Sequence, residues 1–160
     1  MDIRKLKVDS KAQQEGERVD CGRFGWPDIF VTTRSLRCAA FQIEYERLRA
    51  RALREKRQNK ELPASERRNL SDADHEACHR EALISKCLIN IEGFTADGQP
   101  LAFRDLVDLL PDPDYGPLVG LCIAAAGVVG HPEGDPYEDD AGNSPRPSGG
   151  SSDTAAQQTS

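Results

Sequence analysis

Residues 36–60 read LRCAAFQIEYERLRARALREKRQNK, a run of helix-forming residues without Gly or Pro. Such a run predicts one long helix. Two apolar stripes lie on nearly opposite sides of its first half, one made of Leu36, Ala39, Ala40 and Ile43 and the other of Phe41, Tyr45, Leu48 and Ala52. We therefore expect this helix to be packed between neighbours at its start and exposed towards its end.

On the N-terminal side of this helix the sequence favours β-structure. Residues 29–32 (IFVT) are β-branched or aromatic, and they follow a turn-like segment, residues 21–27 (CGRFGWP). A further short stretch, residues 18–20 (RVD), precedes that turn. Two short segments joined in this way predict a hairpin or small sheet near the N-terminus.

A second helix is predicted to begin after Ser71 and to run to about Ile91. Ser71 is a favourable N-cap, and Asp72 and Asp74 follow it as acidic residues of the first turn. The apolar residues that we expect on its buried face are Ala73, Ala77, Ile84, Cys87, Leu88 and Ile91.

Two more helices follow after Gly93 and a turn at residues 97–100. Residues 103–110 predict a short amphipathic helix that ends before Pro111, and a last helix is expected from Pro117 to near Gly130. The predicted fold class is therefore α+β, a mainly helical small domain with an N-terminal β-hairpin.

Composition divides the chain of 160 residues at about residue 131. Residues 132–160 contain no Leu, Ile, Val, Phe, Met, Trp or Cys and are rich in Pro, Gly, Ser and acidic residues. Such a segment buries too little apolar surface to offset the entropy of ordering, so we expect a disordered acidic tail. Residues 1–131 are expected to form one folded domain.

Charge is unevenly distributed. Residues 1–91 hold 19 basic and 15 acidic groups, a net charge of +4, whereas residues 92–160 hold 2 and 12, a net charge of −10. The overall excess of acid argues against tight non-specific binding of nucleic acid. The five cysteines include no Cys-x-x-Cys pair, so neither a disulfide framework nor a four-thiolate zinc site is indicated, and we expect a reducing cytoplasm.

No targeting or membrane segment is predicted. Residues 1–9 mix charged and apolar types and leave no room for the apolar core of a secretory signal. The longest apolar run, residues 118–129, has 12 residues, and a helix of that length rises only about 18 Å. We therefore expect neither secretion nor membrane insertion.

One motif has the form of a zinc hydrolase. His75, Glu76 and His79 match the H-E-x-x-H pattern, in which two histidines one turn apart hold zinc and the glutamate activates water. On the predicted helix both imidazoles point away from the buried face, and the extended form of the motif, with a glycine and a third histidine downstream, is absent. We expect a solvated helix start and no metal or other cofactor, and we keep a zinc hydrolase as a remote alternative.

A basic strip lies on the first long helix. Its cations are interleaved with Glu44, Glu46 and Glu55 and have no aromatic platform for stacking. The basic residues of the strip are Arg47, Arg49, Arg51, Arg54, Lys56 and Arg57. Two interpretations remain open: a solvated helix with ion pairs within it, or a contact to an acidic surface, for which the chain's own acidic tail is a candidate.

The last helix is apolar on all sides. Such a helix either lies at the centre of the core or is partly covered by another protein. Gly120, Ala124 and Gly127 would let a neighbouring helix approach closely. Both interpretations remain open from the sequence.

The order of elements resembles the small tail assembly chaperones of long-tailed, siphovirus-like bacteriophages and prophages. The resemblance covers about residues 1–130. It is carried by the N-terminal segments MDIRKLKV (1–8) and QEGERV (14–19), the short strand DIFV (28–31), the end of the second helix LINIEGF (88–94), and the later segments DGQPLAF (97–103) and DLVDLL (105–110). Ile91 stands where the family usually has a tryptophan.

This resemblance implies a non-enzymatic assembly factor in the cytoplasm of the bacterial host. Members of the family coat the tape-measure protein and help to recruit the major tail protein before the tail tube polymerises. A longer product made by frameshifting and homo-oligomers are possible further partners, whereas nucleic acid and membranes are not expected.

We expect partner contacts at residues of the two long apolar helices. They are Phe41, Tyr45, Leu48, Leu118, Leu121, Cys122 and Ala125. The alternative is a virion structural protein, such as a minor tail or connector component, that stays in the particle.

Overall fold

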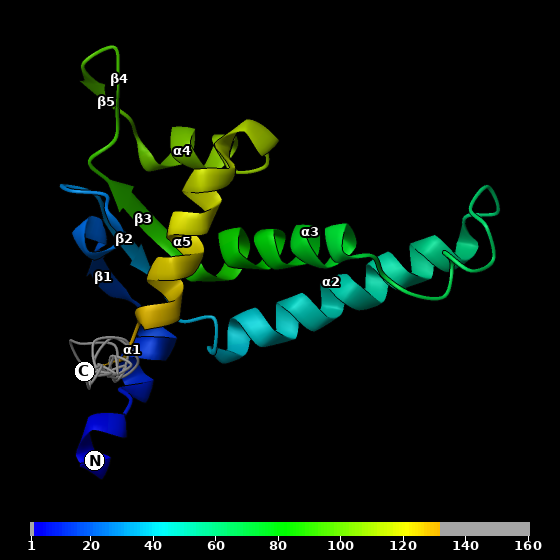
Figure 1. Ribbon diagram of the computed structural model, residues 1–160, viewed down its shortest axis with the longest axis horizontal. Coiled ribbons are helices and arrows are strands. Elements are labelled where there is room, and N and C mark those ends of the chain that lie inside the picture. The colour runs from blue at the N-terminus through cyan, green and yellow to red at the C-terminus, as the bar shows by residue number, and fades with distance from the viewer. Residues whose placement is uncertain (1, 132–160) are drawn as a thin grey trace, which may run out of the picture.

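A three-stranded antiparallel sheet forms one side of the molecule (Figure 1). In the computed structural model, which describes residues 2–131, β2 (Phe30–Thr33) is the central strand, between β1 (Glu17–Asp20) and β3 (Leu88–Glu92). The pairing of β1 with β2 confirms the predicted N-terminal hairpin. Val19, Val31 and Ile91 are register partners across the three strands, and all three are buried. This row forms the sheet's contribution to the core.

Residues 2–131 form five α-helices in addition to the sheet. They are α1 (Ser10–Glu15), α2 (Ala39–Gln58), α3 (Asp72–Ala82), α4 (Phe103–Leu109) and α5 (Gly116–Val128). Short elements connect them: 3₁₀ turns η1 (Ile3–Leu6), η2 (Cys21–Phe24) and η4 (Pro113–Tyr115), and a small hairpin of β4 (Thr95–Ala96) with β5 (Gln99–Pro100). The α+β class is as predicted, and α2, α4 and α5 lie within a few residues of their expected bounds.

The second predicted helix is correct as far as Cys87, although its last turn is π-helical, and is wrong from Leu88 onwards. The helix ends at Ala82, a π-helical segment η3 (Leu83–Cys87) follows, and the chain then enters β3. The reason is tertiary: residues 88–92 supply the third strand, and they pair with β2 in antiparallel register. The buried positions of α3 are Cys78 and Ala82, not the expected Ala73 and Ala77, which are exposed.

Helices α2 and α3 lie side by side and project from the body as an arm (Figure 1). Phe41 and Leu48 of α2 are buried, as are the small residues Cys78 and Ala82 of α3. Small side chains on one helix allow the two axes to approach closely, so this seam is the core of the arm. Beyond it, the outer part of α2 and the loop to α3 are largely exposed, as the sequence predicts for the helix end.

Helix α5 lies over the sheet and packs on β2 and η2. Leu121, Cys122, Ala125 and Ala126 are buried on this side. Burial against the sheet explains the apolar residues on this side of α5, but Val119, Ile123 and Val128 are apolar and only half-buried. The chain leaves the helix next to α1, where the N–H of Asp9 donates to the carbonyl of Gly130 over 2.7 Å. The predicted acidic tail, residues 132–160, lies outside the described residues.

A candidate protein-binding groove

Most of the residues that we expected to contact a partner are buried inside the chain itself. Six of the seven expected contact residues have side chains that are at most 6% exposed. They are Phe41, Leu48, Leu118, Leu121, Cys122 and Ala125. Packing of α2 on α3, and of α5 on the sheet, uses their apolar surface. The expectation that these six side chains form an accessible contact surface is therefore wrong, because a partner cannot reach them in this conformation.

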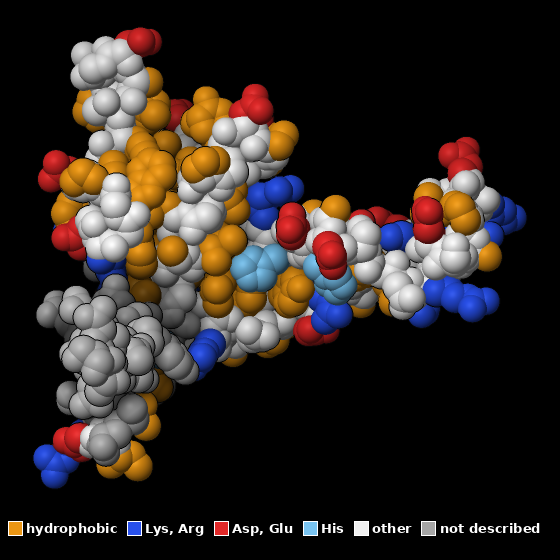
Figure 2. Space-filling view, viewed as in Figure 1, with side chains coloured by type: hydrophobic (Ala, Val, Ile, Leu, Met, Phe, Trp, Pro, Cys, Tyr) orange, Lys and Arg blue, Asp and Glu red, His pale blue; other side chains and the backbone are white. Residues whose placement is uncertain are grey.

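Tyr45 is the exception, because it is half-buried and lines a groove of about 490 Å³ between the arm and α5. The arm contributes Tyr45 from α2 and His75, Glu76, His79 and Arg80 from α3. The opposite wall comes from the segment that runs from the end of α4 through η4 into α5. Apolar side chains gather at this junction, with histidine beside them (Figure 2).

His79 holds the arm side of the groove together. Its imidazole lies edge-on to the ring of Phe41, with centroids 5.1 Å apart, and edge-on to Tyr45, with centroids 5.7 Å apart. Burial lowers the pKa of His79 below its ordinary value, so the neutral form is favoured. The expectation that both imidazoles point into solvent is thus wrong: His79 packs on α2, and both histidines line the groove.

The α5 wall of the groove combines apolar side chains with bare backbone. Val119 and Ile123 are half-buried, whereas Gly116 and Gly120 are exposed. A Cβ added at either glycine would meet no atom within 4 Å in the described part of the chain. Glycine in a helix costs about 1 kcal/mol relative to alanine. The fold itself therefore gives no steric reason for Gly120, which leaves this wall flat enough for another backbone to approach.

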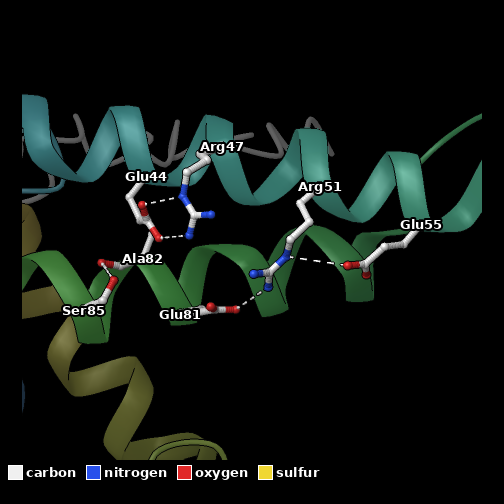
Figure 3. A network of polar contacts seen from close by, with 7 residues as sticks. All are labelled: Glu44, Arg47, Arg51, Glu55, Glu81, Ala82 and Ser85. Carbon is white, nitrogen blue, oxygen red and sulfur yellow. Dashed lines mark hydrogen bonds and ion pairs between the residues drawn. The ribbon is translucent and has the colours of Figure 1, made fainter.

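Ion pairs fix the arm that carries the other wall (Figure 3). Arg51 of α2 lies 3.7 Å from Glu81 of α3 and 3.7 Å from Glu55 of its own helix, so it joins the two helices. Arg47 and Glu44 form a two-pronged pair within α2 over 2.6 and 2.9 Å. Together with Arg49–Glu46, these pairs show ion pairs within the helix for Arg47, Arg49 and Arg51, whereas Arg54 and Arg57 form no ion pair in the described residues, so the second interpretation stays open for that end of the strip.

The start of α3 is fixed by a capping box. The backbone N–H and hydroxyl of Ser71 both donate to Asp74 over 2.8 Å, and the N–H of Asp74 donates back to Ser71. Lys56 of α2 donates to the same carboxylate oxygen over 2.7 Å. The Lys56 ammonium, followed by the Ser71 groups, lowers the pKa of Asp74 to about 2. The Ser71 N-cap was predicted correctly; its link to α2 was not predicted.

The zinc-hydrolase motif does not assemble a metal site among residues 2–131. His75, Glu76 and His79 all line the groove, and Asp112 lies on its other wall. Nevertheless, no group of three or more His, Cys, Asp or Glu side chains in the described residues is placed to hold a metal ion. A catalytic zinc usually has three protein ligands, and the described residues supply no such set at this motif.

The cysteines lie away from the groove, because none of them is among the residues that line it. Burial raises the pKa of Cys122 to about 12, with Cys21 as a second cause, which keeps this thiol protonated. All five cysteines are free and buried. The lining of the groove itself combines the apolar Leu110, Val119 and Ile123 with charged residues of both signs, Glu76, Arg80 and Asp112.

Comparisons with protein-family models, with curated proteins and with solved structures find no match to this chain. Among the described residues, no helix combines the length and the apolar character needed to cross a bilayer.

Sequence reasoning missed His79, Val119, Gly120 and Ile123 as residues of one site. Gly120 had a signal, because a glycine inside an otherwise continuous helix is unfavourable unless something uses the space. His79 had none, since its orientation depends on where α3 ends. The groove itself arises from elements far apart in the sequence.

Proposed function

We propose that the chain is a helix-binding assembly chaperone of the long-tailed phage type, and that the groove between the arm and α5 holds an apolar segment of the tape-measure protein. The observation that carries the proposal is the groove itself: an apolar recess beside an open glycine-containing helix face. Amphipathic helices bind other proteins by laying anchor side chains, spaced three or four residues apart, into such recesses.

The size of the groove suits a few anchoring side chains and not a whole helix. Its volume, about 490 Å³, falls in the range of sites that take small ligands or clusters of side chains. Val119, Ile123 and Tyr45 would contact the anchors, and the flat surface at Gly116 and Gly120 would lie against the partner's backbone. Contacts of this limited size give reversible binding, which a chaperone needs if it is to release its client.

The resemblance in element order supports the choice of client. In that class of protein the client is the tape-measure protein, the major tail protein is recruited to the complex, and the work is done in the cytoplasm of the bacterial host. The proposed role needs no catalytic group and no cofactor. It requires exchangeable apolar contact, which the half-buried residues of the groove offer in place of the buried residues named from the sequence.

The test is co-expression of the full chain with the tape-measure protein encoded by the same genome. The soluble fraction of the tape-measure protein should rise, and the two proteins should co-purify. No change in solubility and no co-purification would contradict the proposal. Recovery of the chain from purified phage particles at a fixed ratio would instead identify a virion structural protein, such as a minor tail or connector component.

A further inference from the structure

A second surface lies at the outer end of the arm. We define the arm tip as residues 54–70, which contain six basic and three acidic residues. Among residues 2–131, Lys56 is the only one of the six cations that forms an ion pair. Arg54, Arg57, Lys60 and Arg68 are exposed. The tip is therefore a cationic surface whose charge is not neutralised by the described part of its own chain.

The chain also contains the complementary charge. Five of the eight residues from 133 to 140 are acidic and none is basic, and residues 132–160 as a whole hold six acidic groups and one basic group. Charge complementarity of this kind steers association and selects the partner surface. Nucleic acid is a less suitable ligand, because the tip has no Phe, Tyr or Trp for stacking and the whole chain has a net charge of −6.

The span of the acidic segment, compared with the distance to the arm tip, decides whether the two can meet within one copy. The start of α2 is attached to α1, where the N–H of Ala39 donates to Gln14, and the chain exit at Gly130 is attached to α1 as well. From there α2 runs 20 residues, about 30 Å, towards the tip at the far end of the longest axis (Figure 1). Residues 132–140 span at most about 30 Å when fully extended.

Contact within one copy would therefore demand a fully stretched segment, and even then only its last acidic residues would arrive. Contact between copies carries no such restriction. We propose that the arm tip of one copy binds the acidic segment, residues 133–140, of a second copy. Each copy then has one donor and one acceptor surface, so the contact is head-to-tail and extends into rings or open chains. This inference does not depend on the groove.

The experiment uses the full chain and measures its mass in solution over a range of protein and salt concentrations. The wild-type protein should self-associate at low salt. It should dissociate as salt rises from about 0.1 M to about 1 M, over which the Debye length falls from about 10 Å to about 3 Å. A protein that stays monomeric at low salt and high concentration would overturn the proposal.

Charge reversal then identifies the two surfaces. We expect the arm variant Arg57→Glu/Arg68→Glu and the segment variant Asp139→Lys/Asp140→Lys each to weaken self-association by about tenfold or more. The matched control is Arg23→Glu/Arg104→Glu, which changes net charge as the arm variant does but at exposed positions on η2 and α4. Equal weakening in this control would overturn the proposal, because it would show a non-specific effect of net charge.

Mixing distinguishes contact between copies from contact within one copy. The arm variant and the segment variant should each self-associate less than the wild type and should associate when mixed, because the arm variant keeps the wild-type segment and the segment variant keeps the wild-type tip. All three charge variants should keep the circular dichroism spectrum of the wild type, since the arm and control positions are exposed. Failure of the mixture to associate would contradict the head-to-tail contact.

Discussion

The imidazole of His79 lies edge-on to the ring of Tyr45, with centroids 5.7 Å apart and an interplanar angle of 80°. This contact joins α3 to α2 on the arm side of the groove. Both residues line the groove, so whatever binds there contacts the pair directly. If the groove is the binding site, as we propose, protonation of His79 is expected to be coupled to binding.

Binding to the groove should depend on pH. An apolar ligand desolvates His79 further and favours its neutral form, whose pKa is already lowered by burial. Affinity for the tape-measure protein should be constant above the ordinary histidine pKa of about 6.5 and should fall as pH drops through the lowered pKa of His79 in the free protein. Titration calorimetry at several pH values measures this. The variant His79→Phe should flatten the dependence. His75 also lines the groove, so His75→Gln is the control, and a full loss of pH dependence in it would contradict the role of His79.

Substitutions at the core and at the groove positions of α5 should lower the free energy of unfolding by different amounts. Leu121 is 3% exposed, so Leu121→Ala removes packed methyl groups and should lower the free energy of unfolding by about 2–4 kcal/mol. Val119 is half-buried at the groove, so Val119→Ala should cost about 1 kcal/mol or less. Urea denaturation followed by circular dichroism measures both. Equal costs would show that Leu121 is not part of the core.

The cap of α3 should make stability sensitive to acid. The pKa of Asp74 is about 2, below its ordinary value of 3.8, so its contribution is present above about pH 4 and is lost as pH falls towards 2. Asp74 is partly exposed, and Asp74→Asn should therefore cost only about 1 kcal/mol at neutral pH. The difference from the wild type should disappear near pH 2. Asp72→Asn, in the same turn, should cost less, and an equal cost would argue against the cap.

The cysteines should not react in the folded protein. All five are buried, and burial raises the pKa of Cys122 to about 12. An aromatic disulfide reagent such as Ellman's reagent should therefore titrate almost no thiol in the native state, and all five after denaturation. Rapid reaction of one thiol in the native protein would show that its surroundings open in solution.

Local signals were enough to predict much of the fold. The Gly- and Pro-free run gave α2, Ser71 gave the N-cap of α3, and Pro117 gave the first turn of α5. Each of these signals depends on residues within one or two turns of the chain. The β1–β2 hairpin was also local, since its strands are joined by residues 21–29, which include η2 and the predicted turn-like segment.

The end of α3 could not be predicted in the same way. No Gly or Pro marks Ala82, and residues 88–92 become a strand because β2 offers an edge to pair with. Because these residues were placed on a helix, the expected buried face was wrong by one position: Ala77 was expected to be buried, whereas Cys78 is. That shift turned His79 towards solvent in the prediction. One missed boundary therefore concealed the arm side of the groove.

The buried face of α5 could also not be predicted without the tertiary structure. From its sequence, an apolar helix can belong either to the core or to a surface that a partner covers. Packing on the sheet decides which of its side chains are buried. Leu121 and Cys122 face that sheet, whereas Val119 and Gly120 face the groove.

The most direct measurement compares two glycines of α5. Gly120 lines the groove, whereas Gly127 is exposed on the same helix outside it, and neither has an atom within 4 Å of an added Cβ in the described chain. Gly120→Gln and Gly127→Gln should both raise stability slightly, by about 0.5–1 kcal/mol, because glutamine is the better helix former.

Binding of the purified tape-measure protein, measured as a dissociation constant, should separate the two variants. Gly120→Gln should weaken binding by about tenfold or more, because the new side chain fills the groove, while Gly127→Gln should bind as the wild type does. Equal affinity of Gly120→Gln and the wild type, with both proteins folded, would contradict the groove as the binding site.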